Sequence, residues 1–221
     1  MNVFDILVKY QQAFAGGLLV TCEMCLIIWS TGLVLGSLLG ILAAKWRLVL
    51  GVPARLIAFI LSGMPMLVFL FWLHYPLQSV LGIVVDPFIT AVVTITIINT
   101  FAVSEVVRTA LIDFPQQYVV AAKVCGLSTY HTVMHIQLPI ILRQTLPGLL
   151  MIQVGMLHAT LFASLISVNE IFRVAQQINS IVYKPVEIYT ALGLLFLAVC
   201  LPMNGLALWL RKRYTRDYSE R

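Results

Sequence analysis

The chain has 221 residues, of which 61% are hydrophobic and 10% are charged, and its formal net charge is +5. Soluble domains are about 45–50% apolar and about 25% charged, so this composition excludes an ordinary soluble enzyme or binding module. Strand-length segments do not alternate apolar and polar residues, which favours membrane-spanning helices over a β-barrel. The sequence therefore predicts an all-α membrane protein with a single transmembrane domain over residues 1–221.

Five apolar runs are long enough to cross the bilayer core as helices, which takes about 20 residues each. In chain order they cover about residues 16–44, 54–74, 87–110, 146–168 and 187–210. Gly63-Met64-Pro65 interrupts the second run, and Pro202 lies inside the fifth, where neighbouring helices can accommodate it. We expect the first run to be a permanent helix, because it is longer than the apolar core of a cleaved signal and no basic cluster precedes it.

The distribution of Lys and Arg predicts the orientation, because cytoplasmic segments retain positive charge. With the C-terminus in the cytoplasm, the outer segments hold only Lys9, Arg173 and Lys184, and the inner segments hold the remaining eleven cations. We therefore expect an outside N-terminus and a cytoplasmic C-terminus. This asymmetry explains the net positive charge without a nucleic-acid partner, and it places the segment of about residues 113–145 in the cytoplasm.

That cytoplasmic segment contains residues that typically begin and end short helices. Residues 118–125 are typical of a short helix, and Gly126 is placed to end it in the left-handed conformation. Ser128 is a suitable N-cap for a second short helix, which we expect to run to about Gln137 and to end before Pro139. His131 and His135 lack the glutamate of a zincin motif, so we expect surface residues and no metal site. Two short helices around a glycine turn predict a protruding element that another protein can bind.

Small and polar residues inside the apolar runs are candidates for specific roles. Gly32, Gly36 and Gly40 recur on one helix face and predict a close-packing seam. Glu23 either faces a cavity or lies hydrated at headgroup depth. We expect Cys22 and Cys25 to be small buried hydrophobes, not a redox or metal pair. The sequence has no Gly-x-x-x-x-Gly-Lys-Ser/Thr motif to bind ATP phosphates and no convincing catalytic triad, so we do not expect an enzyme.

Several motifs, taken in order and register, carry a family resemblance. They are Gly17-x-x-x-Thr21-x-Glu23, Gly63-x-Pro65-x-Leu67-Val68, Glu105-x-x-Arg108, Ala121-Ala122 with Gly126, Leu138-Pro139, and Glu170 with Arg173. Over residues 17–213 the chain resembles permease subunits of the polar-amino-acid group of type I ABC importers. The resemblance implies a five-span fold in a bacterial cytoplasmic (inner) membrane.

The resemblance also implies partners and site residues. Two ABC ATPase subunits would bind ATP and Mg²⁺, a second permease subunit, identical or homologous, would complete the pore, and a periplasmic or surface binding protein would deliver an amino acid or related polar solute. Segment 169–183 would be a gating or docking helix for that protein, or a membrane-surface helix. The coupling loop would dock on the ATPase through Val120, Ala121, Ala122, Lys123, Gly126, Leu127 and Ser128. The translocation path would include Glu23, His158, Thr160 and Ser164.

The chain departs from the family pattern at polar positions. Val120 replaces the usual acidic residue of the loop, Ser62 an arginine, Met151 an asparagine and His158 a lysine. These changes indicate a different solute with His158 as a hydrogen-bonding or pH-sensitive contact, the less polar member of a heterodimer, or neutral drift at lipid-facing positions. The alternative functions are a permease for methionine or compatible solutes and, in another class, a passive channel or assembly scaffold.

Overall fold

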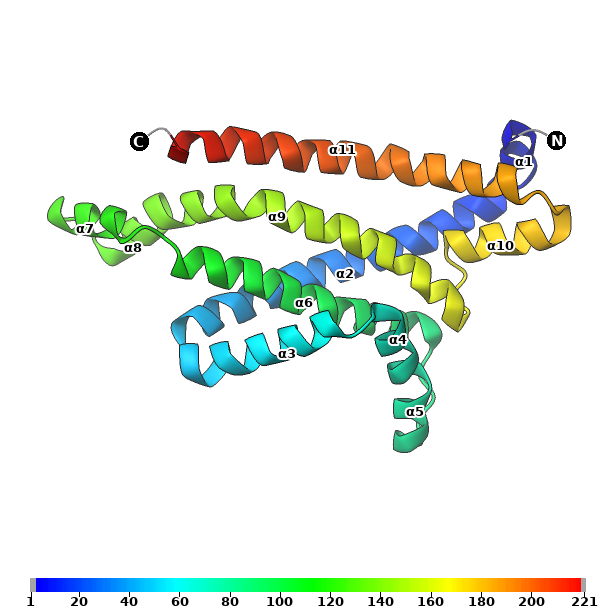
Figure 1. Ribbon diagram of the computed structural model, residues 1–221, viewed down its shortest axis with the longest axis horizontal. Helices are drawn as coiled ribbons and strands as arrows, with labels where there is room; N and C mark the ends of the chain where they lie inside the picture. Colours follow the sequence, from blue (N-terminus) through cyan, green and yellow to red (C-terminus); the bar gives the residue numbers. More distant parts are fainter. Residues whose placement is uncertain (1–2, 220–221) are drawn as a thin grey trace.

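A computed structural model describes residues 3–219, with side chains described through Tyr214. Arg221, one of the cations assigned to the cytoplasm, lies outside this range. Figure 1 shows a helical bundle, and no strand occurs among the described residues. The α-helices are α1 (Val3–Lys9), α2 (Gln11–Lys45), α3 (Val52–Gly63), α4 (Met66–His74), α5 (Pro76–Leu81), α6 (Pro87–Ile112), α7 (Gln116–Val124), α8 (Thr129–Thr132), α9 (Leu138–Ala159), α10 (Ile171–Val182) and α11 (Pro185–Ser219). Shorter π and 3₁₀ segments are η1 (Arg47–Gly51), η2 (Val133–Gln137) and η3 (Thr160–Ile166).

Four helices within the described range are long and apolar enough to cross a membrane, and a bent pair raises the number of candidate spans to five. The four are Gln11–Lys45, Pro87–Ile112, Thr129–Ile166 and Pro185–Tyr214. This architecture confirms the predicted all-α membrane fold. The bent pair, Arg47–Gly63 with Met66–Leu81, turns by 101°, and the bend lies at the predicted Gly-Met-Pro interruption. Pro65 favours an extended residue before it, and Met64 is extended with ψ 127°.

One predicted boundary is wrong. The helix that starts at Thr129 does not end before Pro139 but continues through α8, η2, α9 and η3 to Ile166. Proline lacks a backbone N–H and clashes with an α-helical carbonyl four residues earlier. The π turn η2, closed by the Leu138 N–H on the Val133 carbonyl, widens the helix immediately before the proline. The proline thus alters the helical register without ending the helix.

The predicted glycine face of α2 packs directly on α6. A Cβ atom added at Gly32 would lie 2.9 Å from the Cβ of Asn99, and one at Gly36 would lie 2.7 Å from the Thr100 carbonyl oxygen. At Gly40 the added atom would lie 2.7 Å from the Ser104 carbonyl oxygen. The two backbones therefore approach more closely than any larger residue permits, as in other membrane helix pairs with small residues every four positions.

A buried polar cluster joins this pair of helices to α9. The Asn99 amide donates to the Ile28 carbonyl at 2.9 Å and to Gln153 Oε1 at 3.1 Å, and the Gln153 amide donates back to Asn99 Oδ1 at 3.2 Å. The Trp29 indole donates to the Gln153 carbonyl at 3.1 Å. Polar groups removed from water need such partners, so this cluster fixes α2, α6 and α9 in one register.

Candidate functional site

Helices α7 and α8 project beyond the long helices at one end of the molecule (Figure 1). Pro115 precedes α7, Gly126 follows it with φ +76°, and a Cβ at Gly126 would meet nothing within 4 Å. The glycine is thus required by its left-handed backbone and not by crowding. Ser128 then caps α8 by accepting a hydrogen bond from the His131 N–H at 3.4 Å. The sequence predicted this helix–turn–helix unit from these same residues.

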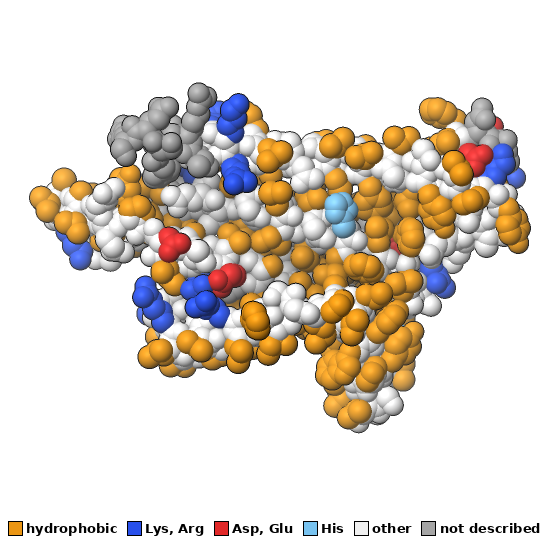
Figure 2. Space-filling view, viewed as in Figure 1, with side chains coloured by type: hydrophobic (Ala, Val, Ile, Leu, Met, Phe, Trp, Pro, Cys, Tyr) orange, Lys and Arg blue, Asp and Glu red, His pale blue; other side chains and the backbone are white. Residues whose placement is uncertain are grey.

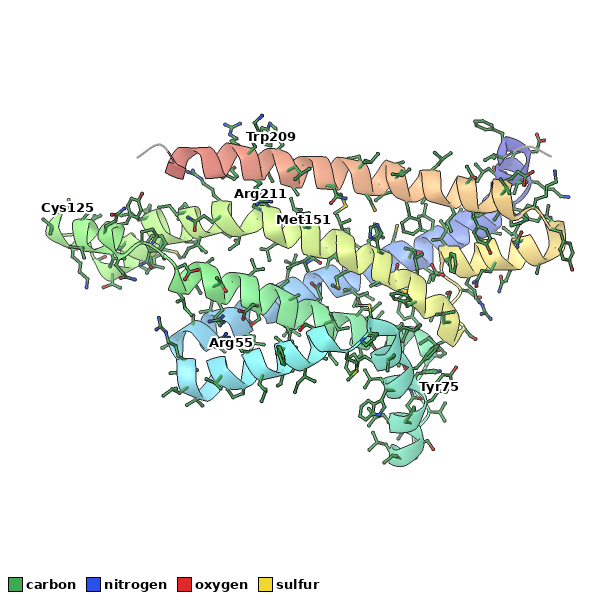
Figure 3. The ribbon with its side chains drawn as sticks, in the orientation of Figure 1. Arg55, Tyr75, Cys125, Met151, Trp209 and Arg211 are labelled. Atoms are coloured by element: carbon green, nitrogen blue, oxygen red, sulfur yellow. The ribbon has the colours of Figure 1, made fainter. Side chains whose placement is uncertain are left out.

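The projection is anchored by a few buried side chains and presents apolar ones outward. Ala122 and Thr132 are buried, as is Phe114 just before the projection. Val124 is 83% exposed and Val120 58%, and together with Leu127 they form what we call the apolar tip of the projection. Lys123 and Cys125 are exposed beside them, and Figure 3 places Cys125 at the outermost turn. An exposed apolar group on a projecting element is typical of a protein-binding surface.

The four candidate residues of the translocation path do not meet in one site. Thr160 and Ser164 are fully buried in η3, where their hydroxyls donate to the carbonyls of Leu157 and Leu161, both at 2.7 Å. Glu23 is exposed on α2 and has no hydrogen bond or ion pair with any described residue. His158 is exposed on α9, and its Nε2 lies 3.2 Å from Cys200 Sγ of α11. Only Glu23 and His158 are therefore accessible from outside the subunit.

The cysteine pair of the first span behaves only partly as expected. Cys25 is buried, but Cys22 is exposed, so the prediction of burial is wrong for Cys22. The two residues are three positions apart and so lie side by side on α2 without both facing its packed side. No group of three or more metal-ligating side chains occurs in the described part of the chain.

At the opposite end from the projection, α10 is fastened to α2 by residues of the sequence motifs. The Ile171 N–H donates to Thr21 Oγ1 at 3.2 Å, and the Thr21 hydroxyl donates to the Gly17 carbonyl at 3.0 Å. A Cβ at Gly17 would lie 2.8 Å from Val174 Cγ2. The Gly-x-x-x-Thr motif therefore has a packing role, whereas Glu23, which ends it, points away.

Glu170 is a buried carboxyl that sequence reasoning recognised only as a family position. It is 0% exposed and caps α10 by accepting from the N–H groups of Arg173 at 2.7 Å and Phe172 at 2.9 Å. Burial raises the pKa of Glu170 to about 7, although the two backbone hydrogen bonds oppose that rise. The Arg173 guanidinium donates to the Ser164 carbonyl at 3.1 Å, which connects α10 to the end of η3.

Sequence reasoning also left the Asn99–Gln153 pair unmarked. Both residues lie in apolar runs, and an amide in such a run is itself a signal that it faces a polar partner inside the bundle.

Glu105 and Arg108 do form the pair that their spacing suggests, with Arg108 Nε 2.9 Å from Glu105 Oε2. Arg55 of α3 lines the same hollow of about 470 Å³ as Glu105.

These features define a multi-pass membrane protein with an exposed apolar projection at one end. The chain belongs to the family described as binding-protein-dependent transport system inner membrane component, which it matches over residues 36–216. It is therefore a membrane-embedded transport component, and the family works with a binding protein and with ATPase subunits.

Curated relatives match over nearly their full length. The chain is 29% identical to the octopine transport system permease protein OccM of Rhizobium meliloti, with 96% of this chain and 94% of that protein covered. It is 26% identical to the histidine/lysine/arginine/ornithine transport system permease protein HisQ of Salmonella typhimurium, covering 95% and 96%. It is 28% identical to the glutamine transport system permease protein GlnP of Escherichia coli, covering 86% and 90%.

Solved structures share the fold. A crystal structure of an amino acid ABC transporter with histidines has a TM-score of 0.81 at 21% identity, covering 94% of this chain and 96% of that one. An inward-facing structure of the MetNI methionine ABC transporter has a TM-score of 0.70 at 18% identity, covering 93% and 98%. At these identities the likeness establishes the fold alone. The names of these two transporters show that this fold occurs in transporters for more than one solute.

Proposed function

We propose that this chain is the permease subunit of an ATP-driven importer for an amino acid or a related small polar solute. The observation that carries the proposal is the apolar tip of the α7–α8 projection, because a subunit without a nucleotide-binding motif must receive its energy through contact with another protein. The three relatives named above, whose names specify octopine, basic amino acids and glutamine, support the solute class.

In this proposal the projection lies in the cytoplasm and the N-terminus outside. Lys and Arg side chains gather toward the end that carries α7 and α8 (Figure 2), which supports this orientation by the positive-inside rule. Two ATPase subunits, holding ATP and Mg²⁺, bind the projections of two permease subunits. A solute-binding protein delivers cargo to the opposite end in the bacterial inner membrane, where α10 is a candidate docking helix.

Docking on the ATPase relies on apolar contact. Val120 stands where the family usually has an acidic residue, and Val120 and Val124 are one helical turn apart and both largely exposed. Their burial in a partner would contribute about 1.5–3 kcal/mol for each fully covered side chain. A carboxylate at Val124 would instead lose its hydration in that apolar contact, which is unfavourable.

The test compares two variants that add the same charge to the same helix. Val124→Glu alters the apolar tip, and Gln116→Glu adds a carboxylate at the exposed first turn of α7, where the helix dipole favours it. We expect Val124→Glu to lower ATPase co-purification and ATP-driven uptake at least tenfold, and Gln116→Glu to leave both within twofold. Equal behaviour of the two variants would remove the tip from the docking surface. Uptake that persists without the ATPase would indicate a passive channel instead.

The solute path is tested at His158. We propose that its exposed imidazole contacts the solute or the second permease subunit, because it is an exposed titratable side chain on α9, where the long helices pack against α11. His158→Ala should reduce uptake severalfold while thermal stability changes little, and Cys200→Ala, which removes its sulfur neighbour, is the matched control. Unchanged solute affinity and uptake in His158→Ala would exclude His158 from the path. Competition by a panel of amino acids, methionine and compatible solutes would then identify the cargo.

A further inference from the structure

A hollow of about 390 Å³ lies between α9 and α11, at the end of the bundle that carries the projection. Arg143 and Gln144 of α9 line it from one side, and Arg211 and Tyr214 of α11 line it from the other. In Figure 3 Arg211 lies on the side of α11 that faces α9 and Met151, whereas Trp209 lies on the opposite side. Two arginines thus reach one cavity from two different helices.

No described side chain neutralises the charge of this hollow. None of the lining residues is acidic. Among the described side chains, neither Arg143 nor Arg211 forms an ion pair, in contrast to Arg108, which is held by Glu105. Two guanidinium groups that share a cavity and lack a carboxylate repel each other, and an anion bound between them removes that cost. A phosphate group suits them, because the planar guanidinium donates two parallel hydrogen bonds to it.

The rest of the hollow is apolar. Its floor is formed by Pro147, Gly148 and Met151, of which Pro147 is buried and Met151 is 48% exposed. Proline and glycine leave a shallow surface over which a hydrocarbon chain can lie. A soluble anion would make no favourable contact with this apolar surface, whereas a lipid has an acyl chain next to its phosphate and can contact both parts of the hollow.

The depth of the hollow also matches a lipid headgroup. Trp209, 53% exposed on the outer side of α11, stacks with Arg213 at 5.2 Å. Tryptophan and tyrosine concentrate at the membrane–water interface, so Trp209 and Tyr214 mark that level on α11. Basic pockets between helices on the cytoplasmic side bind anionic lipid headgroups, and each Lys or Arg near an anionic membrane surface contributes about fivefold in affinity.

We propose that this hollow is a binding site for an anionic phospholipid, with Arg143 and Arg211 holding the phosphate and an acyl chain lying over Pro147, Gly148 and Met151. The site holds α9, which is continuous with the projection, against α11. A bound lipid would therefore stabilise the packing of these two helices at the end where the projection starts.

The experiment measures lipid retention by native mass spectrometry of the purified full-length permease, released from nanodiscs of equal phosphatidylglycerol and phosphatidylcholine. Both leaflets have the same composition, so the result does not depend on the proposed orientation or on transport. We expect the wild-type protein to retain phosphatidylglycerol selectively and Arg143→Gln/Arg211→Gln to lose about twenty-five-fold of that selectivity, at about fivefold for each cation. Arg143→Lys/Arg211→Lys should lose part of that selectivity, because the charge remains but the planar guanidinium that donates two parallel hydrogen bonds is absent.

The matched control is Lys212→Gln/Arg213→Gln, which removes two charges at the same depth outside the hollow and should change retention less than threefold. An equal loss in both double variants would mean unspecific surface attraction and would overturn the proposal, as would no loss in either. Displacement of the lipid by millimolar inorganic phosphate would assign the arginines to a free anion instead. A disulfide between two copies of a Gln144→Cys variant would place the hollow inside a permease interface and would also overturn the lipid site.

Discussion

Replacing Gly36 with alanine tests how closely α2 and α6 must pack. The added Cβ would lie 2.6 Å from Val103 Cβ and 2.7 Å from the Thr100 carbonyl oxygen, whereas ordinary contacts begin near 3.4 Å. The helices would have to separate by about 0.8 Å, a gap that removes a quarter to a half of the dispersion energy of each affected contact. Overpacking of this kind costs about 1–3 kcal/mol, and against backbone atoms we take the upper part of that range. The helix propensity of alanine offsets about 1 kcal/mol.

The net destabilisation of about 2 kcal/mol corresponds to a Tm about 4–8 °C lower for a chain of this size. Thermal unfolding can be followed with a thiol-reactive dye in a Cys22→Ser/Cys125→Ser background, because the remaining Cys25 and Cys200 are buried and react only when the bundle opens. Gly16→Ala is the control on the same helix, since its added Cβ meets nothing within 4 Å and should raise the Tm slightly. A Tm of Gly36→Ala equal to or above that of Gly16→Ala would refute the close-packing argument.

Two further predictions concern buried polar groups. Asn99→Leu leaves Gln153 without its amide partner and should lower the stability of the folded protein by about 1–3 kcal/mol. In the same thiol assay, the Asn99→Leu/Gln153→Leu double variant should lose less stability than the sum of the losses of the two single variants. Additive losses would argue against coupling between the two side chains. The folded pKa of Glu170, about 7, lies above its unfolded value of about 4.3. Between these values the folded state binds the extra proton, so the protein loses about 3–4 kcal/mol of stability as the pH rises from about 4.3 through about 7. Glu170→Gln should therefore show a smaller fall in Tm from pH 5 to pH 8 than the wild-type protein, and identical pH profiles would contradict the raised pKa.

Much of the fold follows from local sequence rules. Apolar length located the long helices, because a bilayer core requires about 20 apolar residues in each one. Gly126 and Ser128 marked the turn of the projection, since a left-handed residue and an N-cap are local requirements. The continuation of the helix through Pro139 could not be read in this way, because the π turn that makes it possible depends on the backbone of the preceding residues and not on the proline alone.

The candidate site was less accessible to sequence reasoning, because it depends on which helices meet. The glycine spacing on α2 predicted a seam, but only the fold identifies Asn99 and Val103 of α6 as the opposing residues. His158 and Thr160 are two positions apart, and one is exposed while the other is buried. Their closeness in the sequence therefore gave no information about which of them faces the outside. The two arginines of the lipid hollow are far apart in sequence and carry no local signal of a shared cavity.

The continuous helix from Thr129 to Ile166 changes how movement at the projection would reach the opposite end. At about 1.5 Å per residue, its 38 residues extend about 57 Å, well beyond the bilayer core of about 30 Å. The predicted break before Pro139 would have separated the projection from the membrane by a flexible joint. In its place the π turn η2 is the one widened segment along this helix in the described chain. A displacement of α8 must therefore either tilt α9 as a whole or deform η2, and tilting would carry the Ser164 carbonyl and its bond to Arg173 of α10 with it.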